Sequence, residues 1–194
     1  MEPHFLGNMF QSLQGLLYRG KKEQISEALH EYANLMKSNF EMMNQEMVPL
    51  EQEIKMLMQF IQARNLLSEV QINYELRINF QSKAGALLIP SMLLQPVVEN
   101  ALEHGLAGNP NPRLILEFQI SNRVRIRIIN NGKDFEEPKV QQRKGSLEVT
   151  RERLHLLSML SKESYSLEFI RELAPYQIKQ GFIVEINIPS IKTT

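Results

Sequence analysis

Apolar residues recur every three or four positions along the first third of the chain, which is the spacing of amphipathic helices. Three runs show it: Phe5, Met9, Leu13 and Leu16, then Ile25, Leu29, Tyr32 and Met36, then Leu50, Ile54, Leu57 and Ile61. Gly20–Lys22 is a candidate turn between the first two runs, and Pro49 stands where a third helix would begin. The pattern predicts a helical hairpin followed by a third helix.

Beyond residue 68 the hydrophobic period changes to two, as expected for strands with one buried face. Alternating segments occur at 70–78, 114–120, 124–128, 165–169 and 182–188. Ser121 and Asn122 separate two of them closely enough to predict a hairpin, and helical spacing returns near 92–104 and 147–160.

These patterns predict an α+β chain. We expect an N-terminal helical hairpin that dimerises, followed by a two-layer α/β sandwich with a mixed, mostly antiparallel sheet that helices cover on one face. The change of period places the domain boundary between residues 1–67 and 68–194, with the third helix assignable to either part.

Composition narrows the classes of function. The 194 residues carry 22 basic and 22 acidic groups, and a zero net charge argues against a nucleic-acid partner. There is no Cys, which excludes a disulfide scaffold and a thiolate zinc site, and Asp134 is the only Asp. No signal peptide stands out, and no apolar run approaches the ~20 residues of a membrane-spanning helix. We expect a cytoplasmic chain without membrane contact of its own, either free or as the cytoplasmic part of a longer membrane-anchored protein.

Two segments carry residues suited to chemistry. His4 shares a polar stripe with Asn8 and Gln11 on the first predicted helix, and a solvent-facing imidazole is a competent nucleophile, although most exposed histidines near a terminus have no such role. The segment Gln95–Gly105 is predicted to form a helix, with Pro near its start and Gly at its end. Its polar residues, which are Glu99, Asn100 and Glu103, either hold a hard cation with a phosphate or face solvent.

Two further segments are shorter. Asn130–Gly132 follows a strand with alternating arginines and is first a turn signal, although such loops also bring amide groups to a base or a phosphate. Lys144–Leu147 leads into the last predicted helix, whose N-terminus suits an anion. On that helix, Arg151 and Arg153 are equally well explained as its polar face.

The order of these segments is more specific than any one of them. A Pro-His-Phe-Leu-x-Asn start, a Leu-Gln-Pro-Val-Val-Glu-Asn-Ala-Leu-x-His-Gly helix, an Asn-Gly strand end and a Leu-x-x-x-Arg-Glu-Arg-Leu helix follow one another. Over nearly the whole chain, this order resembles the LytS/YehU-type sensor histidine kinases of bacterial two-component systems.

The resemblance implies a dimerising hairpin and a Bergerat-type ATPase sandwich. It places His4 in the phosphoacceptor position and Asn100 on Mg²⁺ and the phosphates of ATP, with Glu99 as a catalytic neighbour. The remaining nucleotide contacts that it implies are His104, Asn130, Gly132 and Gly145. The implied partners are a second copy of the chain and the receiver domain of a response regulator, whose aspartate takes the phosphoryl group from His4.

Several positions depart from the family pattern. Asn130 stands where an Asp accepts a hydrogen bond from the adenine amine, and a neutral amide makes the weaker bond. Glu103 replaces a Lys that would face phosphate, and the Gly-x-Gly-Leu box of the family is Lys144-Gly145-Ser146-Leu147 here. Two hypotheses follow: an active kinase core, or a kinase-like protein that no longer uses ATP and acts as a dimeric phosphotransfer or protein-binding module.

Overall fold

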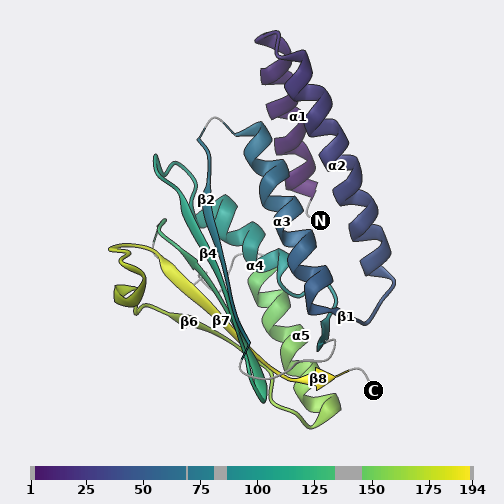
Figure 1. The fold of residues 1–194 in the computed structure, drawn as a ribbon, viewed down its shortest axis with the longest axis vertical. Coiled ribbons are helices and arrows are strands. Elements are labelled where there is room, and N and C mark those ends of the chain that lie inside the picture. Colours follow the sequence, from purple (N-terminus) through teal and green to yellow (C-terminus); the bar gives the residue numbers. More distant parts are fainter. Residues whose placement is uncertain (1–2, 69, 81–86, 134–145, 193–194) are drawn as a thin grey trace.

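Three helices make up the first part of the chain. The computed structural model describes residues 3–68, 70–80, 87–133 and 146–192. Helices α1 (Pro3–Tyr18) and α2 (Lys22–Met43) run antiparallel and are joined at Gly20, whose φ of 71° lies in the left-handed region that glycine tolerates best (Figure 1). Helix α3 (Leu50–Leu67) packs against both of them. The predicted hairpin and third helix are confirmed.

The buried face of α2 differs from the predicted apolar stripe. Its buried residues follow one another in steps of four and three, and are Ala28, Tyr32, Leu35, Asn39 and Met42. Leu29 and Met36, which the periodicity assigned to the buried stripe, are 49% and 50% exposed. Helix α2 therefore carries two neighbouring apolar stripes, and only one of them faces α1 and α3.

A five-stranded sheet forms the centre of the second part. Its strands, in spatial order, are β2 (Asn73–Phe80), β4 (Arg113–Ile120), β5 (Arg123–Asn130), β7 (Phe182–Pro189) and β6 (Ser166–Ile170). Strand β2 pairs with β4 in parallel, and the other pairs are antiparallel, which confirms the mixed sheet. Strands β4 and β5 form the predicted hairpin, while β2 begins at Asn73 rather than at residue 70.

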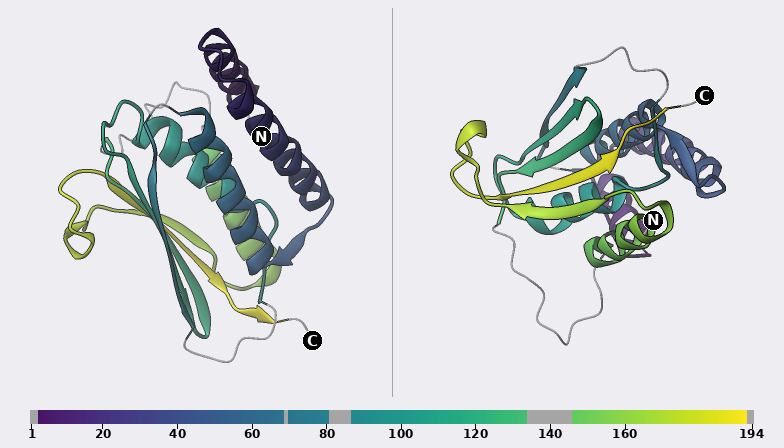
Figure 2. Two further views of the ribbon diagram at one scale, coloured as in Figure 1. Left: turned by 45° about the horizontal axis from the view of Figure 1, so that its top comes forward. Right: turned by 90° about the horizontal axis from the view of Figure 1, so that it is seen from below.

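Helices cover one face of this sheet. The same side of the sheet carries α3, α4 (Gln95–Asn100) with its continuation Ala101–Gly105, and α5 (Ser146–Ser161). The α1–α2 hairpin lies beyond α3 (Figures 1 and 2). The predicted two-layer sandwich is therefore confirmed, with the hairpin added outside it. The other face is partly covered, because a loop with a 3₁₀ turn at Ala174–Tyr176 packs against Ile115 and Ile129.

A second, small sheet was not predicted. Its strands β1 (Met47–Pro49), β3 (Leu87–Pro90) and β8 (Ile191–Lys192) pair antiparallel in the order β1-β3-β8. Strands of two to four residues are too short to show a period, which is why the sequence pattern missed them. Among the described residues, no helix is long and apolar enough to cross a membrane.

Candidate functional site

The helix that carries Asn100 changes its geometry midway. Residues Gln95–Asn100 are α-helical and Ala101–Gly105 form a π-helical turn, closed by a 2.9 Å hydrogen bond from the Leu106 N–H to the Ala101 carbonyl. Such turns are rare and occur frequently at functional sites. Asn100 is partly exposed at the junction, and His104 is exposed in the π-turn.

Glu99 lies on the buried side of this helix. Its carboxylate accepts a 2.7 Å hydrogen bond from the Gln95 side-chain amide, one turn earlier. The neighbouring residues Val97 and Val98 are fully buried and anchor the same face to the core. The structure therefore separates Glu99, which points inward, from Asn100 and His104, which reach the surface. The catalytic role of Glu99 stays a prediction.

The end of β5 packs directly on the end of the Asn100 helix. A Cβ atom on Gly132 would lie 1.7 Å from the Gly105 carbonyl oxygen, so only glycine fits at Gly132. The same carbonyl accepts a 2.8 Å hydrogen bond from the Lys133 N–H. The structure thus brings together two of the sequence-predicted segments, Gln95–Gly105 and Asn130–Gly132.

Asn130 is fully buried at this junction. Its Oδ1 accepts a 3.0 Å hydrogen bond from the Gly132 N–H, and its Nδ2 donates to the Phe182 carbonyl at 3.5 Å. A Cβ atom on Gly105 would lie 2.9 Å from Asn130 Oδ1, and one on Gly181 would lie 1.9 Å from the Asn130 carbonyl oxygen. Backbone therefore encloses the Asn130 side chain, and its predicted contact with adenine stays a prediction.

A cavity of about 540 Å³ lies beside this contact. Its lining includes both Gly105 and Gly132, together with the loops 107–111 and 177–180, but neither Asn100 nor Asn130. The cations Arg113, Lys133 and Lys179 also line it. The cavity therefore lies next to the predicted nucleotide-binding residues. Asn100 and Asn130, the polar side chains on which that prediction depends, do not line it.

The remaining predicted residues lie elsewhere. His4 belongs to the first turn of α1, and its side chain lies outside the described part. Gly145 and Asp134 fall outside the described residues. Among the residues that are described, no group of three or more His, Asp or Glu side chains is arranged to hold a metal ion.

Sequence reasoning missed a polar cluster at the start of the Asn100 helix. Glu53 on α3 is fully buried and accepts hydrogen bonds from the Met92 and Leu94 N–H groups, at 3.0 and 2.9 Å. Burial raises the pKa of Glu53 to about 7, although these two bonds and the Arg153 charge oppose the shift. Arg153 on α5 donates a 2.7 Å bond to the Ser91 carbonyl, so it is more than a polar-face residue.

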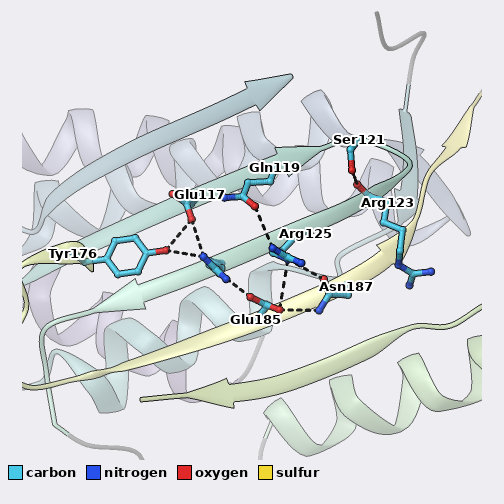
Figure 3. A network of polar contacts seen from close by, with 9 residues as sticks. Glu117, Gln119, Ser121, Arg123, Arg125, Tyr176, Glu185 and Asn187 are labelled. Carbon is cyan, nitrogen blue, oxygen red and sulfur yellow. Dashed lines mark hydrogen bonds and ion pairs between the residues drawn. The ribbon is translucent and has the colours of Figure 1, made fainter. Parts of the chain in front are cut away.

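The opposite face of the sheet carries a second polar network (Figure 3). Arg127 donates to Glu185 at 2.7 Å, and the Tyr176 hydroxyl donates to Glu117 at 2.8 Å while it accepts from Arg127 at 3.3 Å. Burial, together with the hydrogen bond to Glu117, raises the pKa of Tyr176. These contacts join β4, β5 and β7 to the 3₁₀ turn, which explains the alternating arginines of β5 as a structural feature.

Comparison of the sequence with known proteins identifies the family of the chain. A sequence profile of the family described as "Histidine kinase" matches residues 1–71. The sensor protein LytS of Oceanobacillus iheyensis is 30% identical over 140 residues, which cover 71% of this chain and 23% of that protein. The chain belongs with the LytS-type sensor histidine kinases.

A second relative agrees with this assignment. The sensor histidine kinase/phosphatase LytS of Staphylococcus aureus is 26% identical over 174 residues, 86% of this chain and 26% of that protein. The chain therefore spans about a quarter of the length of the LytS proteins that it matches.

The solved structures share the fold of this LytS-type chain. The histidine kinase domain of the Erythrobacter litoralis blue-light-activated kinase has a TM-score of 0.52 at 17% identity, over 90% of this chain and 83% of that one. The catalytic domain of histidine kinase ThkA has a TM-score of 0.54 at 13% identity, over 76% and 97%. ThkA in complex with the response regulator TrrA has a TM-score of 0.50 at 12% identity, over 97% and 59%.

Proposed function

We propose that this chain is the kinase core of a bacterial two-component sensor. The γ-phosphoryl group of ATP is transferred to a ring nitrogen of His4 with ADP as the leaving group, and then to an aspartate of a response regulator. Such transfer depends mainly on positioning and on charge neutralisation, so the protein has to hold phosphate, metal and acceptor in register.

The contact between Gly132 and Gly105 carries this proposal. It joins the two segments whose order suggested a nucleotide site, and it does so at a backbone approach that a side chain on Gly132 would prevent. The LytS relatives support the same reading, because their similarity extends over both the helical part and the sandwich.

Magnesium is proposed to bind at Asn100. Mg²⁺ is held by one or two protein oxygens, with substrate phosphates and waters completing its octahedron. The partly exposed side-chain amide of Asn100 could supply one such oxygen, and Mg²⁺ bound in this way does not require several carboxylate ligands. When bound, the ion would neutralise phosphate charge; Asn100 would orient it, and His104 and Gly132 would border the nucleotide.

A second copy of the chain is the proposed partner for the exposed stripe of α2. Leu29, Met36, Phe40 and Met43 follow one another in steps of seven, four and three, and Phe40 is 73% exposed. On α1, the apolar side chains of Phe10 and Leu17 are also exposed. Two hairpins packed along these stripes would make a four-helix bundle, with heptad spacing along each α2 helix.

The proposed downstream partner is the receiver domain of a response regulator. The structure of ThkA contains a response regulator, and its kinase resembles this chain in fold. We place the chain in the cytoplasm, where both ATP and a receiver domain are available. The match covers only about a quarter of the LytS relatives, and we propose that a sensing part occupies other regions of a longer protein.

Calorimetric titration with Mg·ATP tests the nucleotide half of the proposal. We expect saturable heat with the unaltered chain and at least a tenfold weaker affinity for Asn100→Leu, with Asn122→Ala in the exposed β4–β5 turn as the control. Absence of heat at millimolar nucleotide would overturn ATP use. A chain that binds no nucleotide but accepts a phosphoryl group at His4 from a phosphorylated receiver would instead be a phosphotransfer module.

A further inference from the structure

Residues 91–94 form the turn that connects β3 to the Asn100 helix. Met92 in this turn has a φ of 53°, a left-handed conformation that non-glycine residues adopt uncommonly. The first hydrogen bonds of α4 also start here, because the Val97 and Val98 N–H groups donate to the Leu94 carbonyl at 3.1 and 3.0 Å. The position of Leu94 therefore sets where α4 begins.

Glu53 of α3 holds the turn from one side. Its two carboxylate oxygens accept separate hydrogen bonds, Oε2 from Met92 and Oε1 from Leu94, so both atoms are used. A glutamine could accept only one of these bonds, because its NH₂ group would face the other N–H. The two N–H groups therefore favour a carboxyl group, which offers an oxygen to each of them, over an amide, and Glu53 stabilises the unusual conformation of Met92.

Ser91 ties the same turn to the end of α2. Its Oγ donates a buried 2.7 Å hydrogen bond to the Met42 carbonyl in the last turn of that helix, and its N–H donates to the Glu46 carbonyl at 3.0 Å. Arg153 of α5 donates to the Ser91 carbonyl from the third direction. Elements α2, α3 and α5 thus all reach one turn of four residues.

We propose that Glu53 and Ser91 are positioning residues, which fix the Asn100 helix to the end of α2 and thereby pass movements of the hairpin to the nucleotide site. The argument rests on the proposed role of Asn100, whereas the hydrogen bonds that join the turn to α2, α3 and α5 are observed directly. Helix α4 with its π-turn is short and its inner face is buried, so a displacement of Leu94 moves Asn100 with it.

Residue-level amide hydrogen exchange tests the link without nucleotide. We expect Glu53→Gln to accelerate exchange of the Val97 and Val98 amides about tenfold relative to the β5 amides Ile126 and Ile128, because only α4 loses its anchor. Ser91→Ala, which is a smaller change, should give the same selective pattern. Glu51→Gln, on the exposed side of α3, is the matched control and should exchange like the unaltered chain.

A uniform acceleration of α4 and β5 would mean that Glu53 only supports global stability, and unchanged α4 exchange would mean that the turn is not held by it. Either result overturns the proposal.

Mg·ATP binding provides a second test. Glu53→Gln should raise the Kd for Mg·ATP at least fivefold, and Glu51→Gln should not. Faster exchange in α4 with an unchanged Kd would also overturn the proposed positioning role. If the unaltered chain binds no Mg·ATP, the proposed function fails, whereas the exchange data still decide whether α2 and α4 are linked.

Discussion

Gly132 lies against Gly105 so closely that a Cβ atom on Gly132 would meet the Gly105 carbonyl oxygen at 1.7 Å. This contact seals the end of β5 to the π-turn of the Asn100 helix, and the Lys133 N–H reinforces it with a bond to the same oxygen. It explains why glycine follows the asparagine pair at this strand end: the backbone of one segment occupies the space where a side chain of the other would lie.

Gly132→Ala should therefore destabilise the chain and weaken Mg·ATP binding together. Overpacking of this kind costs about 2–3 kcal/mol of unfolding free energy, because the backbone has to move. Urea unfolding measures the loss, and Gly7→Ala provides the control, since a Cβ there meets nothing within 4 Å and the residue lies in a helix. Equal stability of Gly132→Ala and the unaltered chain would contradict the close packing.

Glu53 should make stability depend on pH. Its pKa is raised to about 7 from 4.5, so the folded chain holds this proton more tightly than the unfolded chain. The resulting stabilisation is complete below about pH 4.5 and is lost as the pH rises through 7. Between pH 5 and pH 8 the unfolding free energy should fall by about 2–3 kcal/mol because of Glu53.

Glu53→Gln removes that titration and should flatten the pH dependence, whereas Glu51→Gln should keep it. Urea unfolding at pH 5, 6, 7 and 8 measures both slopes. The account of Glu53 is wrong if Glu53→Gln and the unaltered chain lose stability in parallel over this range.

Asn39 should limit the stability of the hairpin. It is buried between Leu35 and Met42 on α2, and neither its Oδ1 nor its Nδ2 has a hydrogen-bond partner within the described part of the chain. Asn39→Leu should raise the unfolding free energy by about 1–2 kcal/mol, because a buried polar group without a partner is costly. Asn34→Leu, which is only partly buried on the same helix, should change it by less than about 0.5 kcal/mol. A loss of stability in Asn39→Leu would contradict this reading.

Phe40→Glu should separate the proposed dimer into monomers. The substitution places a charge in the exposed stripe of α2, where a second hairpin would have to bury it. Sedimentation velocity at micromolar concentration distinguishes the two species. Lys37→Glu adds the same acidic side chain on an exposed position outside the stripe and should leave a dimer intact. A monomeric unaltered chain would refute this use of the stripe.

Periodicity was sufficient for the larger elements. The helices α1, α2, α3 and α5 and the hairpin of β4 and β5 have enough residues for a period of 3.6 or 2 to show, and each lies where the pattern placed it. The pattern failed for β1, β3 and β8, which are too short, and for the second stripe of α2, because periodicity identifies apolar faces without showing which partner covers them.

Some residues of the candidate site could be predicted from the sequence and others could not, for a physical reason. Motif order located Gly105 and Gly132, since tight backbone contacts leave glycines in the sequence. Glu53 was missed although a signal existed: it interrupts the apolar face of α3 between Leu50 and Leu57, where a charged residue requires a buried partner. Ser91 and Arg153 left no such signal, because hydrogen bonds to backbone carbonyls depend on tertiary arrangement alone.

Phosphoryl transfer to His4 tests the central claim most directly. The unaltered chain, incubated with Mg²⁺ and ATP labelled in its γ-phosphate, should acquire label that is lost in acid, retained in base and absent from His4→Gln. His30→Gln, which alters another histidine of the hairpin, should be labelled normally. An unaltered chain that binds Mg·ATP but takes up no label, or a label that persists in His4→Gln, would contradict the assignment of this chain as a histidine kinase core.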